Sequence, residues 1–146
     1  LPEPMNYNNS EKYTVTILIS TFGYRKVRVY NKPGTETEDT FQFVSMILDE
    51  WATNPAYANK TIMCDNLNSH KHPRIQNRVV QRGHKWIFRP PYSPWLGPIE
   101  YYFNYLQCRL TDRLHQIHNF ADLNAAVLEI TAEVDDFTPF FAHCGY

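Results

Sequence analysis

The first third of the chain changes from a two-residue hydrophobic period to a helical one. Between Lys12 and Ser20 alternate side chains are large and apolar, which is typical of a strand with one buried face. Residues 24–30 are again rich in β-forming side chains, and the short connection around Gly23 predicts an antiparallel hairpin. Farther along, apolar residues recur at helical spacing, which predicts an amphipathic helix over about residues 37–53.

The middle of the chain has two short apolar runs with a helical pattern between them. Residues 60–64 read KTIMC, a continuously apolar strand of the kind that is buried in parallel sheets. Pro73 suits the first position of a helix and Gly83 the position just past its end. Residues 85–89 (KWIFR) predict the next strand. A strand, a helix and a strand within about 30 residues form a βαβ unit, so we expect two parallel strands with a right-handed crossover.

The last third predicts two more helices and a short aromatic tail. One helix opens at Gly97-Pro98, and the other begins near Asn119 with Asp122 placed to cap it. The residues expected to face inward are Ile99, Phe103, Leu106 and Leu110 in the first helix and Leu123, Val127, Ile130 and Val134 in the second. The tail from Pro139 onward is expected to pack on the core. The element order β-β-α-β-α-β-α-α therefore predicts an α/β domain with a mixed sheet.

The net charge of −1 conceals a strong asymmetry along the chain. Residues 66–99 contain six Lys or Arg and no acid, whereas residues 110–146 contain one Arg and six acids. The basic residues of this central block are Lys71, Arg74, Arg78, Arg82, Lys85 and Arg89. The block indicates a polyanionic partner such as DNA, with a basic, solvated helix face as the alternative.

Composition limits the class of protein. A chain of 146 residues is about one domain long, and its apolar content is sufficient for a core. No apolar run approaches the roughly 20 residues of a membrane span, so we expect no membrane partner. The three cysteines are an odd number without the spacing of a disulfide framework, which favours a reducing, intracellular compartment.

Asp65 and Glu100 are the candidate catalytic and metal-binding residues. Asp65 directly follows the strand predicted at residues 60–64, and Glu100 lies in the first turn of the helix after strand 85–89. Sites of open α/β sheets form at the carboxyl ends of parallel strands, so the two carboxylates can converge although 34 residues separate them. Adjacent carboxylates repel each other unless a cation lies between them, and their hard oxygen atoms suit Mg²⁺ or Mn²⁺.

Both acids also have structural alternatives. Asp65, followed by Asn66, can build a turn or cap the next helix, and a Glu at a third helical position is favoured by capping and by the helix dipole. A zinc site made of Cys64, His70 and His72 is a further alternative, but no second ligand pair at zinc-finger spacing follows. Position in the chain leaves these alternatives open.

Two stretches resemble the second and third acidic motifs of DDE transposases of the Tc1/mariner group. They are MCDNLNSHKH at residues 63–72 and FRPPYSPWLGPIEYYFNYLQCRL at residues 88–110. Family members have a strand that ends in Asp-Asn with His-Lys nearby, followed by a PPYSP…PIE signature that opens a helix. The spacing of the two acids fits the Tc1-like branch, and the closing FFAHCGY resembles the tail of these domains. Two residues depart from the signature: Gly97 replaces the usual Asn, and Trp95 stands where a small or acidic residue is more common.

The resemblance implies an RNase H-like fold, with a mixed sheet of an antiparallel hairpin plus parallel strands and with flanking helices. It also implies a first catalytic Asp on a central strand before the hairpin. Residues 1–11 contain Glu3 and Glu11 but no strand-like run, so neither is given that role. We therefore expect residues 1–146 to form an N-terminally truncated DDE endonuclease domain that lacks its first, central strand.

The resemblance further implies metal-dependent cleavage and strand transfer of DNA. Asp65, Glu100 and the absent Asp would hold two Mg²⁺ or Mn²⁺ ions, with Asn66 and His70 beside them. The basic block would contact the phosphates of transposon ends and target DNA. A homodimer that acts on paired ends and a nuclear localisation are implied by the family alone.

Two other functions stay open at this point. One is a catalytically inactive, domesticated or decayed transposase remnant that acts as a DNA-binding or interaction module, although the intact Asp65 and Glu100 argue against long decay. The other is a different RNase H-like nuclease, which would cleave nucleic acid without joining strands.

Overall fold

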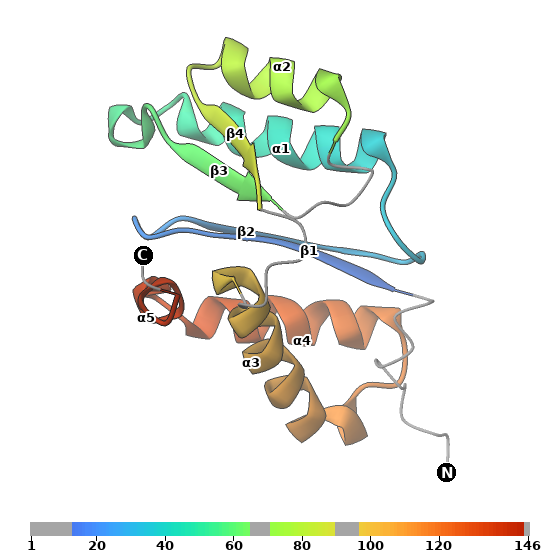
Figure 1. Ribbon diagram of the computed structural model, residues 1–146. Coiled ribbons are helices and arrows are strands. Elements are labelled where there is room, and N and C mark those ends of the chain that lie inside the picture. Colours follow the sequence, from blue (N-terminus) through green and yellow to red (C-terminus); the bar gives the residue numbers. More distant parts are fainter. Residues whose placement is uncertain (1–12, 65–70, 90–96, 145–146) are drawn as a thin grey trace. The chain divides into compact units, whose positions relative to one another are not determined.

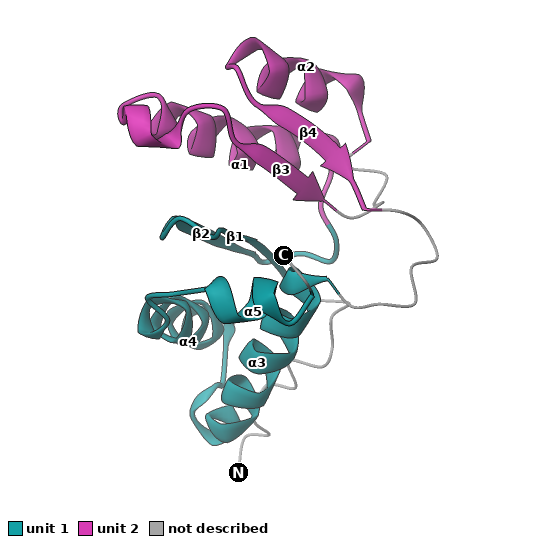
Figure 2. Cartoon of the chain, turned by 60° about the vertical axis from the view of Figure 1, so that its left-hand side comes forward, with its two compact units in different colours: residues 1–34, 94–146 teal, residues 35–93 magenta. Residues whose placement is uncertain are grey.

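The computed structural model describes residues 13–64, 71–89 and 97–144. The chain folds into two compact units, unit 1 with residues 1–34 and 94–146 and unit 2 with residues 35–93 (Figures 1 and 2). Each unit has its own pair of strands and its own helices. No helix in the described part of the chain has both the length and the apolar character needed to cross a membrane.

Unit 1 begins with the predicted hairpin. Strands β1 (Thr14–Ile19) and β2 (Arg25–Tyr30) pair in antiparallel fashion. The turn between them is closed by Ser20, whose hydroxyl donates to the carbonyl of Tyr24 (2.6 Å) and accepts the Tyr24 N–H (2.9 Å). Gly23 has a φ of +84°, a left-handed conformation that glycine adopts with little strain. The predicted hairpin and its glycine turn are confirmed.

Helices of unit 1 supply most of its core. They are α3 (Pro98–Asp112), α4 (Phe120–Glu133) and the short α5 (Thr138–Ala142), with a 3-10 turn at Leu114–Gln116. Successive strand residues point to opposite faces, so one face of the hairpin packs on the helical core. The hairpin residues on that face are Tyr13, Val15, Ile17, Ile19, Val27 and Val29. The buried residues beneath them are Tyr102, Leu106, Leu110, Ile117, Leu123, Ala126, Val127, Ile130 and Phe137.

The buried face of α3 differs from the predicted one. Leu106 and Leu110 are buried as expected, but Ile99 and Phe103 are only partly buried, and Tyr102 is fully enclosed. The tyrosine can be buried because its hydroxyl donates a hydrogen bond of 3.1 Å to Oγ1 of Thr131 in α4, itself buried. Burial raises the pKa of the Tyr102 hydroxyl. A hydrophobic pattern predicts burial of Ile and Phe before burial of Tyr. Tyr102 is nevertheless the most deeply buried of the three, because Thr131 on α4 satisfies its hydroxyl.

The other helical predictions of unit 1 are confirmed with small changes. Leu123, Val127 and Ile130 face inward in α4, whereas Val134 lies just past the end of the helix and is partly buried. Residues of the aromatic tail form α5, and its Phe140 packs against the core as predicted.

Unit 2 contains the predicted βαβ unit. Strands β3 (Thr61–Cys64) and β4 (Lys85–Phe88) pair in parallel, with α2 (Pro73–Gln81) between them in sequence. Helix α1 (Thr37–Trp51) packs against α2. The apolar side chains buried in this unit are Phe43, Val44, Ile47, Leu48, Trp51, Ile62, Ile75, Val79 and Trp86. The alternation along β3 and β4 therefore turns Ile62 and Trp86 inward.

The described strands form two separate two-stranded sheets. The antiparallel pair β1–β2 and the parallel pair β3–β4 share no ladder of hydrogen bonds among the described residues. The mixed α/β class with antiparallel and parallel strands is thus confirmed, whereas the predicted mixed sheet that lacks its central strand stays a prediction. Such an arrangement is compatible with an RNase H-like domain.

His84 lies directly before β4 and bonds to Lys60, directly before β3. The sequence did not predict a role for it. It is buried, its Nδ1 accepts the Lys60 N–H (3.0 Å), and its ring lies edge-on to Trp51 with 5.1 Å between ring centroids. Burial lowers the pKa of His84 below its usual value of 6.5, because the cation would lose hydration. The acceptor role of Nδ1 also requires that this nitrogen carry no proton.

Protonation of His84 should therefore destabilise the fold. The unfolded chain binds this proton more readily, so the stabilisation is complete above about pH 6.5 and is lost as the pH falls through the lowered folded-state pKa. We expect the free energy of unfolding to decline between about pH 7 and pH 5. The variant His84→Asn keeps an acceptor but cannot take the proton, so its urea unfolding should show a shallower decline; equal declines would refute this role of His84.

Candidate active site

Glu100 lies at the third position of α3, where its carboxylate also caps the helix. Gly97 precedes the helix with an extended backbone, and Pro98 occupies the first helical position. The Glu100 carboxylate accepts a hydrogen bond from the Gly97 N–H, and the Glu100 N–H donates to the Gly97 carbonyl (3.1 Å). The capping role that the sequence allowed is therefore present, and it holds the carboxylate at the start of the helix.

Capping is compatible with metal binding at the same carboxylate. An ionised carboxylate has two oxygen atoms with about four acceptor positions, and the bond from the Gly97 N–H uses one of them. Glu100 is also only partly buried. Its oxygen atoms are hard donors, which suit Mg²⁺ or Mn²⁺, so Glu100 fits as a ligand of such an ion.

The edge of the sheet from which Asp65 departs is described as far as Cys64. Strands β3 and β4 run parallel and end side by side, and the Arg89 N–H donates to the Cys64 carbonyl at 2.8 Å. The predicted common edge of the two strand ends is confirmed. Asp65, Asn66 and His70 lie outside the described residues, so their convergence with Glu100 stays a prediction.

The described residues do not by themselves make up a metal centre. Within residues 13–64, 71–89 and 97–144, no group of three or more His, Cys, Asp or Glu side chains could hold an ion. Of the two predicted metal ligands, Glu100 belongs to these residues and Asp65 does not. A metal site that includes both Asp65 and Glu100 stays a prediction.

Two arginines of the basic block bind acidic residues of α1. Arg74 forms an ion pair with Glu38, and its guanidinium lies 3.7 Å from the centre of the Phe41 ring. Arg82 donates to Oδ1 of Asp49 at 2.9 Å and to the carbonyl of Leu48 at 3.2 Å. These contacts hold α2 against α1. The sequence showed the spacing of the arginines, but nothing in it indicated that their partners were on α1.

The remaining basic residues differ in exposure. Lys71, before α2, and Lys85, at the start of β4, are exposed. Arg78 and Arg89 are partly buried. Arg89 directly follows β4 and donates to the Cys64 carbonyl, whereas Lys85 lies at the opposite end of β4. The predicted DNA contacts of all six basic residues stay predictions.

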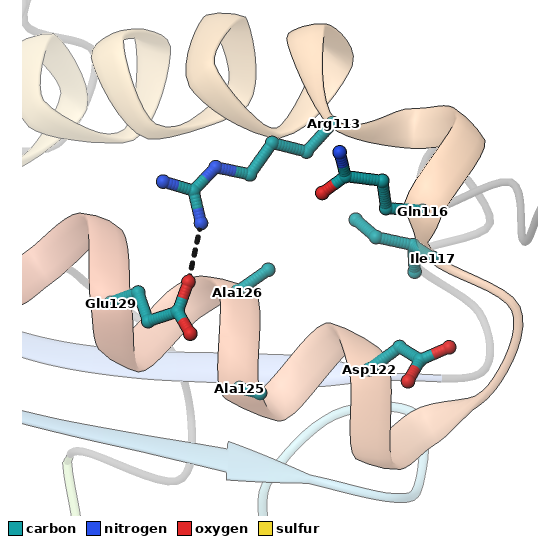
Figure 3. Close-up of a pocket in the computed structure, with 7 residues that line it drawn as sticks. All are labelled: Arg113, Gln116, Ile117, Asp122, Ala125, Ala126 and Glu129. Atoms are coloured by element: carbon teal, nitrogen blue, oxygen red, sulfur yellow. Dashed lines mark hydrogen bonds and ion pairs between the residues drawn. The ribbon is translucent and has the colours of Figure 1, made fainter.

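A shallow pocket in unit 1 lies between the end of α3 and helix α4 (Figure 3). Its lining includes Arg113 and Glu129, whose side chains form an ion pair of 2.7 Å across it. Arg113 and Arg109 also bind the two carboxylate oxygens of Glu133, each at 2.9 Å. Paired charges of this kind join two helices, and the predicted site residues that the structure describes do not line the pocket.

Comparison with known protein families identifies the superfamily of the chain. A family model described as DDE superfamily endonuclease matches residues 5–124, which include β1 through the start of α4 and both candidate carboxylates. No curated protein matches the chain. Because the family model covers most of the sequence, the chain belongs to the DDE superfamily of endonucleases.

Proposed function

We propose that this protein is a DNA transposase of the Tc1/mariner group that cleaves and transfers DNA strands with the help of divalent metal ions. Membership of the DDE endonuclease superfamily supports a nuclease or transposase function, and such domains generally use divalent metals and bind DNA. The observation that carries the proposal is the position of Glu100. Glu100 lies in the first turn of α3, the helix that follows β4 in the sequence. Strand β3, the parallel partner of β4, is followed directly in the sequence by Asp65.

Asp65 and Glu100 would be two of three ligands for Mg²⁺ or Mn²⁺. We propose that the third carboxylate comes from a further strand, which is not among the strands described here. When bound, the ions would activate the attacking oxygen and stabilise the negative charge that develops on the leaving oxygen. Asn66 would orient Asp65 through its amide, and His70 would lie beside the same site.

The proposed reaction has two steps. In cleavage, a water oxygen bonds to phosphorus as the bond from phosphorus to the 3′-oxygen breaks, which leaves a 3′-hydroxyl. In strand transfer, that hydroxyl oxygen attacks a target phosphate, and one phosphodiester replaces another.

The chain would also position the DNA. Lys71 and Arg89 would neutralise phosphates, without reading sequence. A homodimer in the nucleus that holds two DNA ends is part of the same proposal.

Glu100→Gln should separate the structural from the catalytic role of this residue. Glutamine retains an oxygen that can accept the Gly97 N–H, so the free energy of unfolding should fall only by the charge–dipole contribution, about 0.3–1 kcal/mol. It has lost the charge that a metal ligand needs, so Mg²⁺-dependent nicking of supercoiled DNA by the full-length protein should be abolished. Asp65→Asn should have the same effect on nicking.

The matched control for this experiment is Glu129→Gln, an equal loss of charge on α4, which should leave nicking intact. Retained nicking in Glu100→Gln would refute the assignment. If the unmodified full-length protein binds DNA but never nicks it with Mg²⁺ or Mn²⁺, the chain is the inactive DNA-binding remnant instead.

Residues of the basic block should fall into two groups. Lys71→Ala and Lys85→Ala remove exposed charges, so each should reduce the slope of log K against log salt for DNA binding by about 0.9 without loss of stability. Arg82→Ala removes the bonds to Asp49 and Leu48 and should cost about 1 kcal/mol in urea unfolding, with an unchanged slope. An unchanged slope in both lysine variants would place the DNA on another surface.

A further inference from the structure

The start of α3 is supported by the last described helix of the chain. Helix α5 packs on α3, as the teal unit of Figure 2 shows. The ring of His143, just past α5, stacks on Tyr101 with 4.8 Å between centroids and 27° between planes. Tyr101 directly follows Glu100, so this contact reaches the turn that carries the candidate metal ligand.

A second contact to the same turn comes from the phenylalanines of α5 and the residue before it. Phe137 and Phe140 lie edge-on to Tyr102, with centroids 5.3 and 5.4 Å from its ring. Tyr105, one turn later, also contacts Phe140 at 5.9 Å. Edge-on and stacked rings attract each other beyond the area that they bury. The segment around α5 thus holds the first two turns of α3 through three of its aromatic residues.

His143 differs from the phenylalanines in its surroundings. Phe137 is almost completely buried and belongs to the core, whereas His143 is exposed. The stack on Tyr101 is therefore a contact that the core of unit 1 does not require. The stack instead restrains Tyr101, the residue that follows Glu100, whose carboxylate caps the same helix.

We propose that His143 is a positioning residue that acts through the Tyr101 ring and fixes the first turn of α3, and with it the Glu100 carboxylate, in the orientation that binds metal. The cap from Glu100 to the Gly97 N–H holds the carboxylate relative to the helix start. The stack on Tyr101 holds that helix start relative to α5. Two restraints on adjacent residues leave the carboxylate little freedom, so less order has to be imposed when a metal ion binds. This inference rests on the proposed metal-binding role of Glu100.

The test compares variants of the full-length protein by Mn²⁺ titration and by amide hydrogen exchange. His143→Ala should weaken Mn²⁺ binding about two- to tenfold, which corresponds to one aromatic contact. It should also speed exchange in peptides that contain Glu100–Tyr102, whose N–H groups are held by the start of the helix, while exchange in α4 is unchanged. His143→Phe keeps a ring that can stack and should restore both values. His115→Ala, at an exposed histidine of the same unit, is the matched control.

The outcomes separate the two proposals. If His143→Ala changes neither Mn²⁺ affinity nor amide exchange, the positioning role is wrong. It is also wrong if His143→Phe fails to restore both values, because the effect of His143 would then come from a ring nitrogen and not from the stack. If Glu100→Gln binds Mn²⁺ as the unmodified protein does, the metal-binding role of Glu100 is wrong. In that case the exchange rates still decide whether His143 holds the first turn of α3.

Discussion

The burial of Tyr102 is the constraint on which unit 1 depends. A fully enclosed phenol must have a hydrogen-bond partner, because an unsatisfied buried hydroxyl costs about 1–3 kcal/mol. Thr131 of α4 provides that partner, and Phe137 and Phe140 enclose the ring from the side of α5. One side chain thereby connects three helices, and it lies two residues after Glu100. Its packing therefore fixes the same stretch of α3 that carries Glu100.

Charge has a different role in unit 2. The central block of the sequence carries six basic residues, but two of them form ion pairs with acidic residues of α1: Arg74 with Glu38, and Arg82 with Asp49. Exposed pairs of this kind contribute little to stability each, yet they orient α2 on α1. The six basic residues are therefore not equivalent, although nothing in the sequence separates Arg74 and Arg82 from the other four.

Glu100 caps α3, and its position in the helix is compatible with the metal-binding role proposed for it. The start of a helix presents unpaired N–H groups and a partial positive charge, which favour a carboxylate. The same carboxylate is held at the place where the chain emerges from the proline-rich stretch after β4. A ligand restrained by its own helix loses less entropy when it binds an ion, which is consistent with a catalytic acid at a helix start.

Local sequence determined most of the secondary structure of this protein. The two-residue period of the hairpin, the glycine at its turn, Pro73 at the start of α2 and Gly83 past its end are short-range signals, and each element formed where they indicated. The motifs around Asp65 and Glu100 likewise predicted the superfamily to which the chain belongs. Such signals succeed because steric and capping preferences act over a few residues.

Tertiary structure decided what depends on partners distant in sequence. It enclosed Tyr102 completely and left Ile99 and Phe103 only partly buried. The hydroxyl of Tyr102 can be buried because of its bond to Thr131, a partner 29 residues away in sequence. It gave Arg74 and Arg82 partners on α1, and it made His84 a buried acceptor for the Lys60 N–H. It also turned the aromatic tail into a support for the turn that carries Glu100. A one-dimensional pattern records which side chains are apolar or charged, but the free energy of burying a polar group depends on the partner that only the fold provides.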